Sequence, residues 1–429
     1  MIKIKKSSII LFISALLFSC SSAPEKPCAG TGSPSGAAIA RKVSGNSQKF
    51  DVAAIIWPAY QNEPRWKELG IFAHGCGEWQ NVYEGKPRFE GHYQPMVPYW
   101  GYGLDDDPVE MSRQIDAALA AGINVFIYDW YWYQGRPFLE NALNNGFLKA
   151  PNNERMKFYL MWANHDVNKL WNNKEPVKKM KNPYYRAAVS YDEFTKVLVP
   201  RFIEYFKKPN YYKIDGKPVF MLYDHVVFAS GLGGTEKARQ ALQYFRDEVK
   251  KAGFKGLHLQ VPFAPWQPPL AIPGSKKPTW GQYYRYLGVD SATCYNWNSL
   301  SRFNATTAKD DIDYEKYGDL ALSRFDEIAK LIECPFIANV TTGWDNNARY
   351  PEGVRTKITL NKTPQAYERF LRKARDWAEK NSGNAPRLII INAWNEWTEG
   401  GYLMPDKKFG YGFLNATARV FNNTENAAE

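Results

Sequence analysis

The sequence predicts an α/β fold, a (β/α)8 TIM barrel that forms a single domain with a long loop after its first strand. Eight apolar runs of strand length are spread along the chain, and near-continuous apolar runs are typical of parallel strands covered on both faces. Helical patterns lie between several of these runs. Eight strand-then-helix units in roughly 370 residues fit the size of such a barrel.

The expected strands leave room for a helix after each of them. They are residues 52–57, 124–130, 157–163, 217–223, 258–263, 291–296, 336–341 and 388–393. The clearest helical patterns are residues 108–121, 191–206, 236–252, 320–332 and 364–379. The first and last of these helices begin with an N-cap followed by proline, at Asp107-Pro108 and Thr363-Pro364, and Gly122 ends the first one.

An open, doubly wound sheet is the alternative fold. A dinucleotide-binding sheet of that kind has a GxGxxG turn after a strand, and the sequence contains none. The glycine-rich residues 231–234 lack this spacing, and we interpret them as a loop. Residues 58–105 form one long insertion rich in aromatic residues after the first strand. Since we find no internal repeat and no second domain, we assign residues 49–429 to one catalytic barrel.

The composition excludes a disordered or fibrous protein. The 429 residues are 45% hydrophobic and 15% aromatic, which is enough to bury a large core. Fifteen Trp and 27 Tyr are more amphipathic rings than such a core needs, and their polar edges are costly to bury without a partner. We therefore expect many rings at a binding surface.

The basic charge does not indicate a nucleic-acid partner. The net charge is +11, and without Lys3, Lys5 and Lys6, which belong to a segment that we expect to be removed, it falls by three to +8. The sequence has no run of five or six Lys or Arg residues. A nucleic-acid-binding protein would carry a basic stripe with interleaved aromatic residues.

The N-terminus is typical of a targeting signal. The basic residues are followed by the apolar run 9–18, which is short for a membrane span, and by Cys20. This resembles a bacterial lipoprotein signal (residues 1–19), with Cys20 lipidated and residues 20–48 as a flexible Ser/Gly/Ala/Pro-rich tether. We therefore expect a lipid-anchored protein of the cell envelope. An ordinary signal peptide with a chance cysteine is the alternative.

The other cysteines do not predict a zinc site. Cys28, Cys76, Cys294 and Cys334 are widely spaced and form no CxxC pair. An exported protein can form disulfides, but Cys294 and Cys334 are equally consistent with small buried side chains. We expect no metal and no cofactor.

The expected strand ends predict a carbohydrate site. The active site of this fold lies at the C-terminal ends of the strands, and nearly every expected end pairs an aromatic ring with a carboxylate, amide or imidazole. Flat rings suit the C–H face of a pyranose, and the polar groups bind its hydroxyls. The candidate substrate-binding residues at strand ends are Trp57, Tyr60, Asp129, Trp130, Trp132, Trp162, Asn164, His165, Tyr223, Asp224, Tyr295, Asn296, Trp344, Trp394, Asn395 and Trp397, and those in the insertion are Glu78, Trp79, His92, Tyr93 and Gln94.

Several of these residues have an equally plausible structural role. Asp129 is either a sugar ligand or a hydrogen-bond hub of the barrel. Trp79 either closes over a ligand with Glu78 or forms the small core of its own loop. His165 and His225 are expected to meet at the barrel mouth as hydroxyl-binding imidazoles, because a metal hydrolase of this fold would show His-x-His on a strand and none is present.

The strongest single motif is Asn395-Glu396-Trp397-Thr398-Glu399-Gly400, after the eighth expected strand. Two carboxylates three residues apart on a turning backbone can face one cleft, and glycoside hydrolysis needs two such groups in different protonation states. Burial and mutual repulsion would raise the pKa of one of them. The alternative is a helix N-terminus at which the glutamates only favour the macrodipole.

The chain resembles the WbsX-like family over roughly residues 51–405. That family belongs to the clan of glycoside hydrolase families 71 and 99, and many of its members carry a glycosyltransferase label. The resemblance is carried, in order, by Gly77-Glu78-Trp79, Asn81-Val82, Pro87, Phe89, Gly91-His92-Tyr93-Gln94-Pro95, Asp129-Trp130-Tyr131-Trp132, Trp162-Ala163-Asn164, Asn392-Ala393-Trp394-Asn395-Glu396-Trp397 and Glu399-Gly400.

The Asn-Glu-Trp-x-Glu-Gly segment also resembles the catalytic segment of family 99, whose members are metal-independent retaining barrel enzymes acting on α-mannans. That resemblance implies that Glu396 is a base, assisting attack by the substrate 2-hydroxyl through an anhydro-sugar intermediate. It implies that Glu399 is the general acid/base. A substrate without a 2-hydroxyl trans to the leaving group would make Glu396 a direct nucleophile or a base that activates water.

The predicted function is hydrolysis of glycosidic bonds in a polysaccharide or glycan, with Glu396 and Glu399 catalytic. A nucleotide-sugar glycosyltransferase is the main alternative, because residues 105–107 and 311–313 contain Asp-x-Asp. We interpret the first triplet as a helix cap and the second as a charged loop. A non-catalytic glycan-binding lipoprotein is the other alternative, and it would need the aromatic residues without the glutamate pair.

Overall fold

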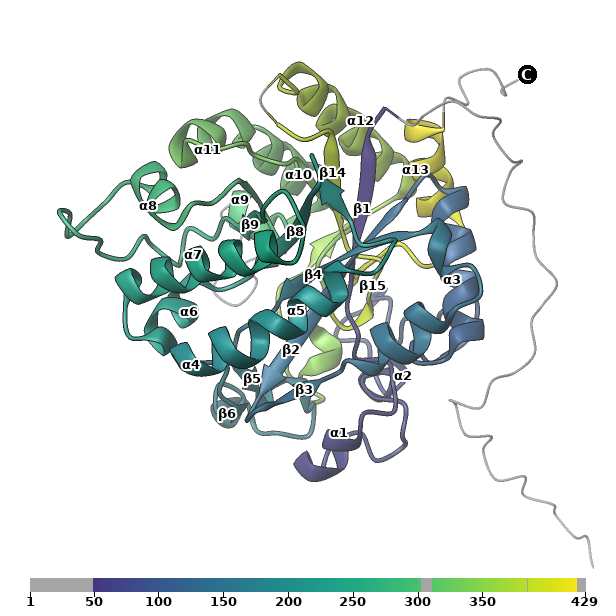
Figure 1. Ribbon diagram of the computed structural model, residues 1–429. Helices are drawn as coiled ribbons and strands as arrows, with labels where there is room; N and C mark the ends of the chain where they lie inside the picture. Colours follow the sequence, from purple (N-terminus) through teal and green to yellow (C-terminus); the bar gives the residue numbers. More distant parts are fainter. Residues whose placement is uncertain (1–48, 302–310, 384, 423–429) are drawn as a thin grey trace, which may run out of the picture.

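The computed structural model describes residues 49–301, 311–383 and 385–422. In these residues eight parallel strands form a central barrel, and helices surround it (Figure 1). The strands are β1 (Asp51–Ile56), β2 (Val125–Tyr133), β4 (Lys157–Trp162), β8 (Lys217–Leu222), β9 (His258–Pro262), β10 (Ser291–Thr293), β12 (Asn339–Thr341) and β14 (Leu388–Asn392). Their order is β10-β9-β8-β4-β2-β1-β14-β12. All eight expected strands and the (β/α)8 fold are confirmed.

The two ends of this strand order meet through the segment before β12. Ala292 in β10 forms a parallel bridge with Phe336. The Ala292 amide donates to the Pro335 carbonyl at 2.9 Å, and the Ile337 amide donates to the Ala292 carbonyl at 2.7 Å. These bonds close the barrel.

The side chains of β2 alternate between the barrel mouth and the surrounding helices. β2 pairs with β1 and β4, then extends past the barrel as a hairpin with β3 (Arg136–Phe138). Since successive side chains in a strand point to opposite faces, Asp129 and Tyr131 reach the mouth. Trp130 points outward, packs against Phe202 of α5 (Val199–Phe206) and donates to Glu140 at 2.8 Å.

The two proline-started helices begin as the sequence predicts. α3 (Pro108–Ala120) is capped by Asp107, whose side chain accepts from the Val109 amide at 2.9 Å. α12 (Pro364–Lys380) is capped by the Thr363 hydroxyl, which accepts from the Ala366 amide at 3.1 Å. The expected helix 236–252 corresponds to α7 (Thr235–Lys251).

Two expected helices are interrupted. Residues 320–332 belong to α10 (Tyr314–Leu322) and α11 (Phe325–Ile332), with a break where the Ser323 hydroxyl bonds back to the Leu320 carbonyl. Residues 191–206 comprise α4 (Tyr191–Glu193), the π-helical turn Phe194–Leu198 and α5, in which Pro200 has no amide to donate.

Within the described ranges, six α-helices lack a clear sequence pattern and are not among the predicted ones: α1 (Pro64–Leu69), α2 (Trp79–Tyr83), α6 (His225–Leu232), α8 (Trp280–Leu287), α9 (Asn298–Ser301) and α13 (Gly412–Phe421). Of the glycine-rich residues 231–234, the first two lie in α6 and not in a loop.

The insertion after β1 is folded onto the barrel mouth and contains α1 and α2. Its conformation depends on Gly77, which has φ of 58° and where an added Cβ would lie 1.9 Å from the Ala59 carbonyl oxygen. The following residue, Glu78, donates its amide to the same carbonyl at 2.9 Å. The turn thereby directs the Glu78 side chain toward the barrel.

The predicted signal (1–19), tether (20–48) and lipidated Cys20 lie outside the described residues. In the described part of the chain, no helix is both long and apolar enough to cross a membrane. Cys294 is buried, Cys334 is partly exposed, and both are free thiols.

Candidate active site

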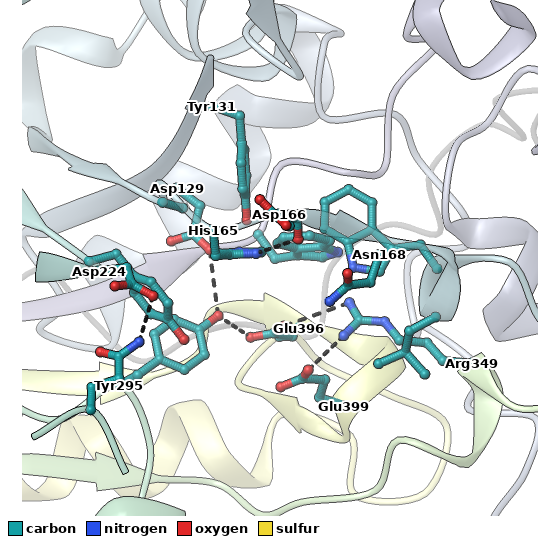
Figure 2. Close-up of a pocket in the computed structure, with 16 residues that line it drawn as sticks. Asp129, Tyr131, His165, Asp166, Asn168, Asp224, Tyr295, Arg349, Glu396 and Glu399 are labelled. Carbon is teal, nitrogen blue, oxygen red and sulfur yellow. Dashed lines mark hydrogen bonds and ion pairs between the residues drawn. The ribbon is translucent and has the colours of Figure 1, made fainter. Parts of the chain in front are cut away.

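A cavity of about 310 Å³ opens at the C-terminal ends of the strands (Figure 2). Each of the eight barrel strands, or the segment that follows it, contributes to its wall. The lining residues are Trp57, Asp129, Tyr131, Ala163, His165, Asp166, Asn168, Leu170, Trp171, Tyr223, Asp224, Gln267, Tyr295, Arg349, Glu396 and Glu399.

The segment after β14 directs both glutamates into this cavity. Glu396 immediately precedes the 3-10 turn Trp397–Glu399, and Gly400, with φ of 67°, ends it. Side chains three residues apart in a 3-10 turn lie above one another, so Glu396 and Glu399 face the same space. Asn395 fixes this segment to β1, because its side chain accepts from the Trp57 amide at 2.8 Å and donates to the Trp57 carbonyl at 2.9 Å.

Arg349 connects the two glutamates and is the main site residue that sequence reasoning missed. It ends the 3-10 turn Asn347–Arg349 between β12 and α12, and its side chain is only 4% exposed. Its guanidinium donates to Glu399 at 2.6 Å and lies 3.8 Å from Glu396. It also donates twice to Glu78, at 2.6 and 3.1 Å. Arg349 is therefore surrounded by three carboxylates.

Glu396 is also connected to Asp129 through Tyr295. The Tyr295 hydroxyl donates to Glu396 and lies 3.5 Å from the Asp129 carboxylate (Figure 2). The other oxygen of Asp129 is buried and has no hydrogen-bond partner among the described residues. Tyr295 thus links Glu396 and Asp129 in one polar cluster at the cavity.

Three carboxyl groups of the cavity, those of Glu396, Glu399 and Asp129, have raised pKa values. Burial, followed by the charge of Glu399, raises the pKa of Glu396 well above its usual value. Burial also raises the pKa of Glu399, while the nearby Arg349 opposes this increase. Burial and the charge of Glu399 raise the pKa of Asp129. Two neighbouring carboxyl groups in different environments provide one proton donor and one acceptor near neutral pH.

Aromatic rings form the opposite wall. Trp57 packs edge-on against Trp171 with ring centroids 5.0 Å apart, and against Tyr131 at 5.9 Å. His165 contacts Tyr131 and Tyr223. Apolar ring faces beside carboxylates suit the two faces of a sugar ring.

The structure brings part of the predicted site together. Trp57, Asp129, His165, Tyr223, Asp224, Tyr295, Glu396 and Glu399 line the cavity. Tyr131, Asp166, Asn168, Trp171, Gln267 and Arg349 line it as well and were not among the candidates. Tyr131 could have been found from strand parity, because it is two residues after Asp129. The segments carrying Trp171 and Arg349 give no such signal.

Many predicted ligands are core residues instead. Trp130, Trp132 and Trp162 point to the helices around the barrel, and Trp394 donates to Gln114 of α3. Tyr60, Trp79 and Trp397 pack against one another behind the cavity. Asn164 and Asn395 bond to backbone groups, and Asn296 accepts from the Asn298 amide. Since a strand turns alternate side chains away from the mouth, consecutive residues at its end do not all reach a ligand.

Glu78 is fully buried and does not line the cavity. Besides Arg349, its carboxylate accepts from the Trp57 indole at 2.6 Å and from the Thr398 hydroxyl at 2.9 Å. Glu78 therefore binds Arg349 and is not placed to bind a sugar in the cavity.

His92, Tyr93 and Trp344 line a second cavity of about 190 Å³. His92 and Gln94 both contact Asp345, at 2.8 and 3.0 Å. The structure therefore separates these four predicted ligands from the glutamate pair.

The two histidines expected to meet do not. His225 is buried in α6 against Tyr283, and burial lowers its pKa to about 4. Only His165 reaches the cavity. Among the described residues, no cluster of three or more His, Cys, Asp or Glu side chains is arranged to hold a metal ion.

A family model described as "Glycosyltransferase WbsX" matches residues 52–417. Two curated relatives, each described as "Uncharacterized protein WxcX" and from two strains of Xanthomonas campestris pv. campestris, are 26% identical over 378 residues. The match covers 86% of this chain and 49% of each relative, so the chain spans about half the length of the curated relatives it matches.

Solved structures share the fold. A "Glycoside hydrolase-like protein" has a TM-score of 0.54 at 14% identity, covering 91% of this chain and 98% of its own. A GH99 endo-alpha-mannosidase from Bacteroides thetaiotaomicron, in complex with bis-tris propane, has a TM-score of 0.52 at 14% identity, covering 87% and 96%. At this level of identity the likeness establishes the fold and leaves the activity open.

Proposed function

The chain belongs to the glycosyltransferase WbsX family, and from the geometry of its cavity we propose that it is a glycoside hydrolase acting on a polysaccharide or glycan. One observation carries the proposal: Glu396, which is buried, and Glu399, whose side chain is 16% exposed, converge on one cavity walled by aromatic rings and contact the same guanidinium. A non-catalytic glycan-binding protein would need the rings without such a pair.

Cleavage of the glycosidic bond requires two proton transfers. A protonated carboxyl gives its proton to the leaving oxygen as the C–O bond to the anomeric carbon breaks, and a carboxylate takes the proton of the attacking hydroxyl or water. The roles implied by the family resemblance are Glu396 as base and Glu399 as acid/base. The 2.6 Å contact with Arg349 favours the ionised form of Glu399, which is the opposite of the protonated form that the acid role needs at the start. We propose that the proton moves from Glu396 to Glu399 when substrate binds.

The charge of the cavity argues against a nucleotide-sugar donor. Its lining carboxylates are Asp129, Asp166, Asp224, Glu396 and Glu399. Among the described lining residues, the single guanidinium is Arg349, which already contacts Glu78 and Glu399. A diphosphate would meet repulsion with no free cation to offset it. The same charge favours a neutral sugar over a uronic acid next to the glutamates.

The two Asp-x-Asp motifs have structural roles. Asp107 caps α3 and Asp313 caps α10. Asp105 is buried and accepts from Asn395 and Gln114, while Asp311 contacts Arg355. None of these four carboxylates lines the cavity, so glycosyl transfer is supported by the family name and not by these motifs.

Product analysis tests the proposal. The purified protein is incubated with yeast α-mannan, other neutral α-glycans and acidic polysaccharides, and the products are separated by chromatography. We expect hydrolysis of a neutral glycan, and loss of hydrolysis in Glu399→Gln with oligosaccharide binding retained. Glu204→Gln, an exposed residue of α5, is the control. Full activity of Glu399→Gln, or consumption of a nucleotide sugar in place of hydrolysis, would overturn the assignment.

We also propose that a lipid on Cys20 anchors the chain to a membrane of the cell envelope. The basis is the sequence Leu17-Phe18-Ser19-Cys20 after a basic and apolar segment. An alkyne fatty acid fed to expressing cells should label the full chain and not Cys20→Ser. Equal labelling of the two would contradict the proposal.

A further inference from the structure

Arg349 is held between the catalytic pair and Glu78. Two of its nitrogens bond to Glu78, and a third donates to Glu399. The ion pair with Glu78 is almost completely buried, since the two side chains are 4% and 1% exposed. Burial alone lowers the pKa of Arg349, but the charges of Glu78 and Glu399 raise it well above the usual value, so the guanidinium stays charged.

Arg349 lies closer to Glu399 than to Glu396. It lies 2.6 Å from an oxygen of Glu399 and 3.8 Å from an oxygen of Glu396. An opposite charge favours the ionised form of a carboxyl group, and the effect increases at short distance and in a buried site. A small displacement of the guanidinium would therefore change which glutamate is ionised.

Glu78 prevents such a displacement. Its carboxylate is fixed by the Trp57 indole, the Thr398 hydroxyl and the Asn81 amide group, the last at 3.4 Å. Thr398 lies in the same 3-10 turn as Glu399. Glu78 thus ties the insertion after β1, Arg349 and the catalytic turn into one hydrogen-bonded unit.

We propose that Arg349, held in place by Glu78, is a positioning residue that determines which of the two catalytic glutamates carries the proton. The effect on catalysis rests on the proposed function, because it requires that the two glutamates are catalytic. The arrangement of charges that it describes is measurable without a substrate.

The other titratable groups around the pair do not replace Arg349. Those that line the cavity are Asp129, Tyr131, His165, Asp166, Tyr223, Asp224 and Tyr295. Tyr60, Tyr317 and Tyr350 lie outside the lining but also interact electrostatically with one of the glutamates. The carboxylates among them oppose ionisation of both glutamates, and burial lowers the pKa of His165. Substitutions at Glu78 and Arg349 leave all of them in place.

Two substitutions then have opposite expected effects. Arg349→Gln removes the positive charge, so the pKa of Glu399 should rise more than that of Glu396. Glu78→Gln removes a negative charge near Glu399 and leaves Arg349 with fewer competing partners, so the pKa of Glu399 should fall. A purely structural role of either residue predicts no such pair of opposite shifts.

The experiment is a titration of glutamate side chains labelled with ¹³C at the carboxyl carbon, followed by NMR. The Glu396 and Glu399 signals are assigned with Glu396→Gln and Glu399→Gln. Arg349→Gln leaves Glu78 buried without its cation, so the double variant Glu78→Gln/Arg349→Gln is titrated in parallel. Its Glu399 pKa should exceed that of the unmodified protein, because Arg349 bonds directly to Glu399 and its charge acts on Glu399 more strongly than the opposing charge of Glu78. Arg349→Lys should restore part of the difference.

Arg201→Gln is the matched control, because Arg201 also pairs with a glutamate, Glu140, outside the cavity. It should leave the Glu399 titration unchanged. An unchanged or lowered Glu399 pKa in the double variant would overturn the inference. On a hydrolysed glycan, the acid limb of kcat/KM should move to higher pH in the double variant and to lower pH in Glu78→Gln. The expected NMR shifts without hydrolysis of any glycan would overturn the proposed function alone.

Discussion

Tyr295 donates a hydrogen bond to Glu396 across the mouth of the barrel. Tyr295 follows β10 and Glu396 follows β14, two strands that are not neighbours in the barrel. The contact forms because the C-terminal ends of all eight strands surround one cavity. It places a phenol beside the carboxyl group whose pKa burial raises well above its usual value.

Tyr295→Phe should therefore change the pH dependence of hydrolysis. The hydrogen bond from Tyr295 lowers the pKa of Glu396, so its loss should raise that pKa and move the basic limb of the pH–rate profile to higher pH. A hydrogen bond to a charged group is worth about 1.5–3 kcal/mol, which corresponds to a loss of about 10-fold to 160-fold in kcat. The rate loss is measured as kcat, and the limbs are measured as kcat/KM against pH, because kcat/KM reports the pKa values of the free enzyme. A uniform loss of rate, with both limbs of the profile unchanged, would contradict the expected rise in the pKa of Glu396.

Glu396→Gln should stabilise the protein while inactivating it. Because folding raises the pKa of Glu396, the folded state binds this proton more tightly than the unfolded chain does. The unmodified protein therefore loses stability as pH rises above the unfolded pKa of about 4.3. Glutamine removes that penalty. The Tm of Glu396→Gln should exceed that of the unmodified protein by about 2 °C at pH 8, and the difference should vanish near pH 4. A lower Tm of Glu396→Gln than of the unmodified protein at pH 8 would show that the charge of Glu396 does not destabilise the folded state.

The sequence predicts the scaffold well because the scaffold depends on local patterns. Strands such as residues 388–393 are recognisable as unbroken apolar runs, and Asp107-Pro108 starts a helix by its own chemistry. The glutamate pair was found for the same reason, since Glu396 and Glu399 lie in one short motif after one strand.

The rest of the site depends on contacts between distant segments. Arg349 comes from a 3-10 turn with no apolar period, and its partner Glu78 is 271 positions away in the chain. No local pattern links them. Trp130 and Trp132 lie outside the cavity for a different reason, because side chains alternate along a strand. Those of Asp129 and Tyr131 reach the mouth, and the two tryptophans point to the surrounding helices.

Gly77→Ala should damage both the fold and the site. Gly77 has a left-handed conformation, and its added Cβ would collide with the Ala59 carbonyl. The turn that positions Glu78 would have to move, and we expect a loss of roughly 2–4 kcal/mol in the free energy of unfolding. Chemical denaturation measures it. Gly91→Ala, at φ of 79° with nothing within 4 Å, should cost only about 1 kcal/mol. Equal losses would show that the collision is relieved elsewhere.

Trp266→Ala should weaken the action on long glycans. Trp266 is 60% exposed on the loop after β9, although most of the tryptophans are buried, and the next residue, Gln267, lines the cavity. A large exposed ring at the rim can stack on a sugar outside the cavity, which is worth about 1 kcal/mol. KM for a polysaccharide should therefore rise about fivefold, while the hydrolysis of an oligosaccharide that fits inside the cavity stays the same. Tyr244→Ala on α7, an exposed ring far along the chain from any lining residue, is the control. If both substrates are affected equally, Trp266 supports the loop and does not bind the glycan.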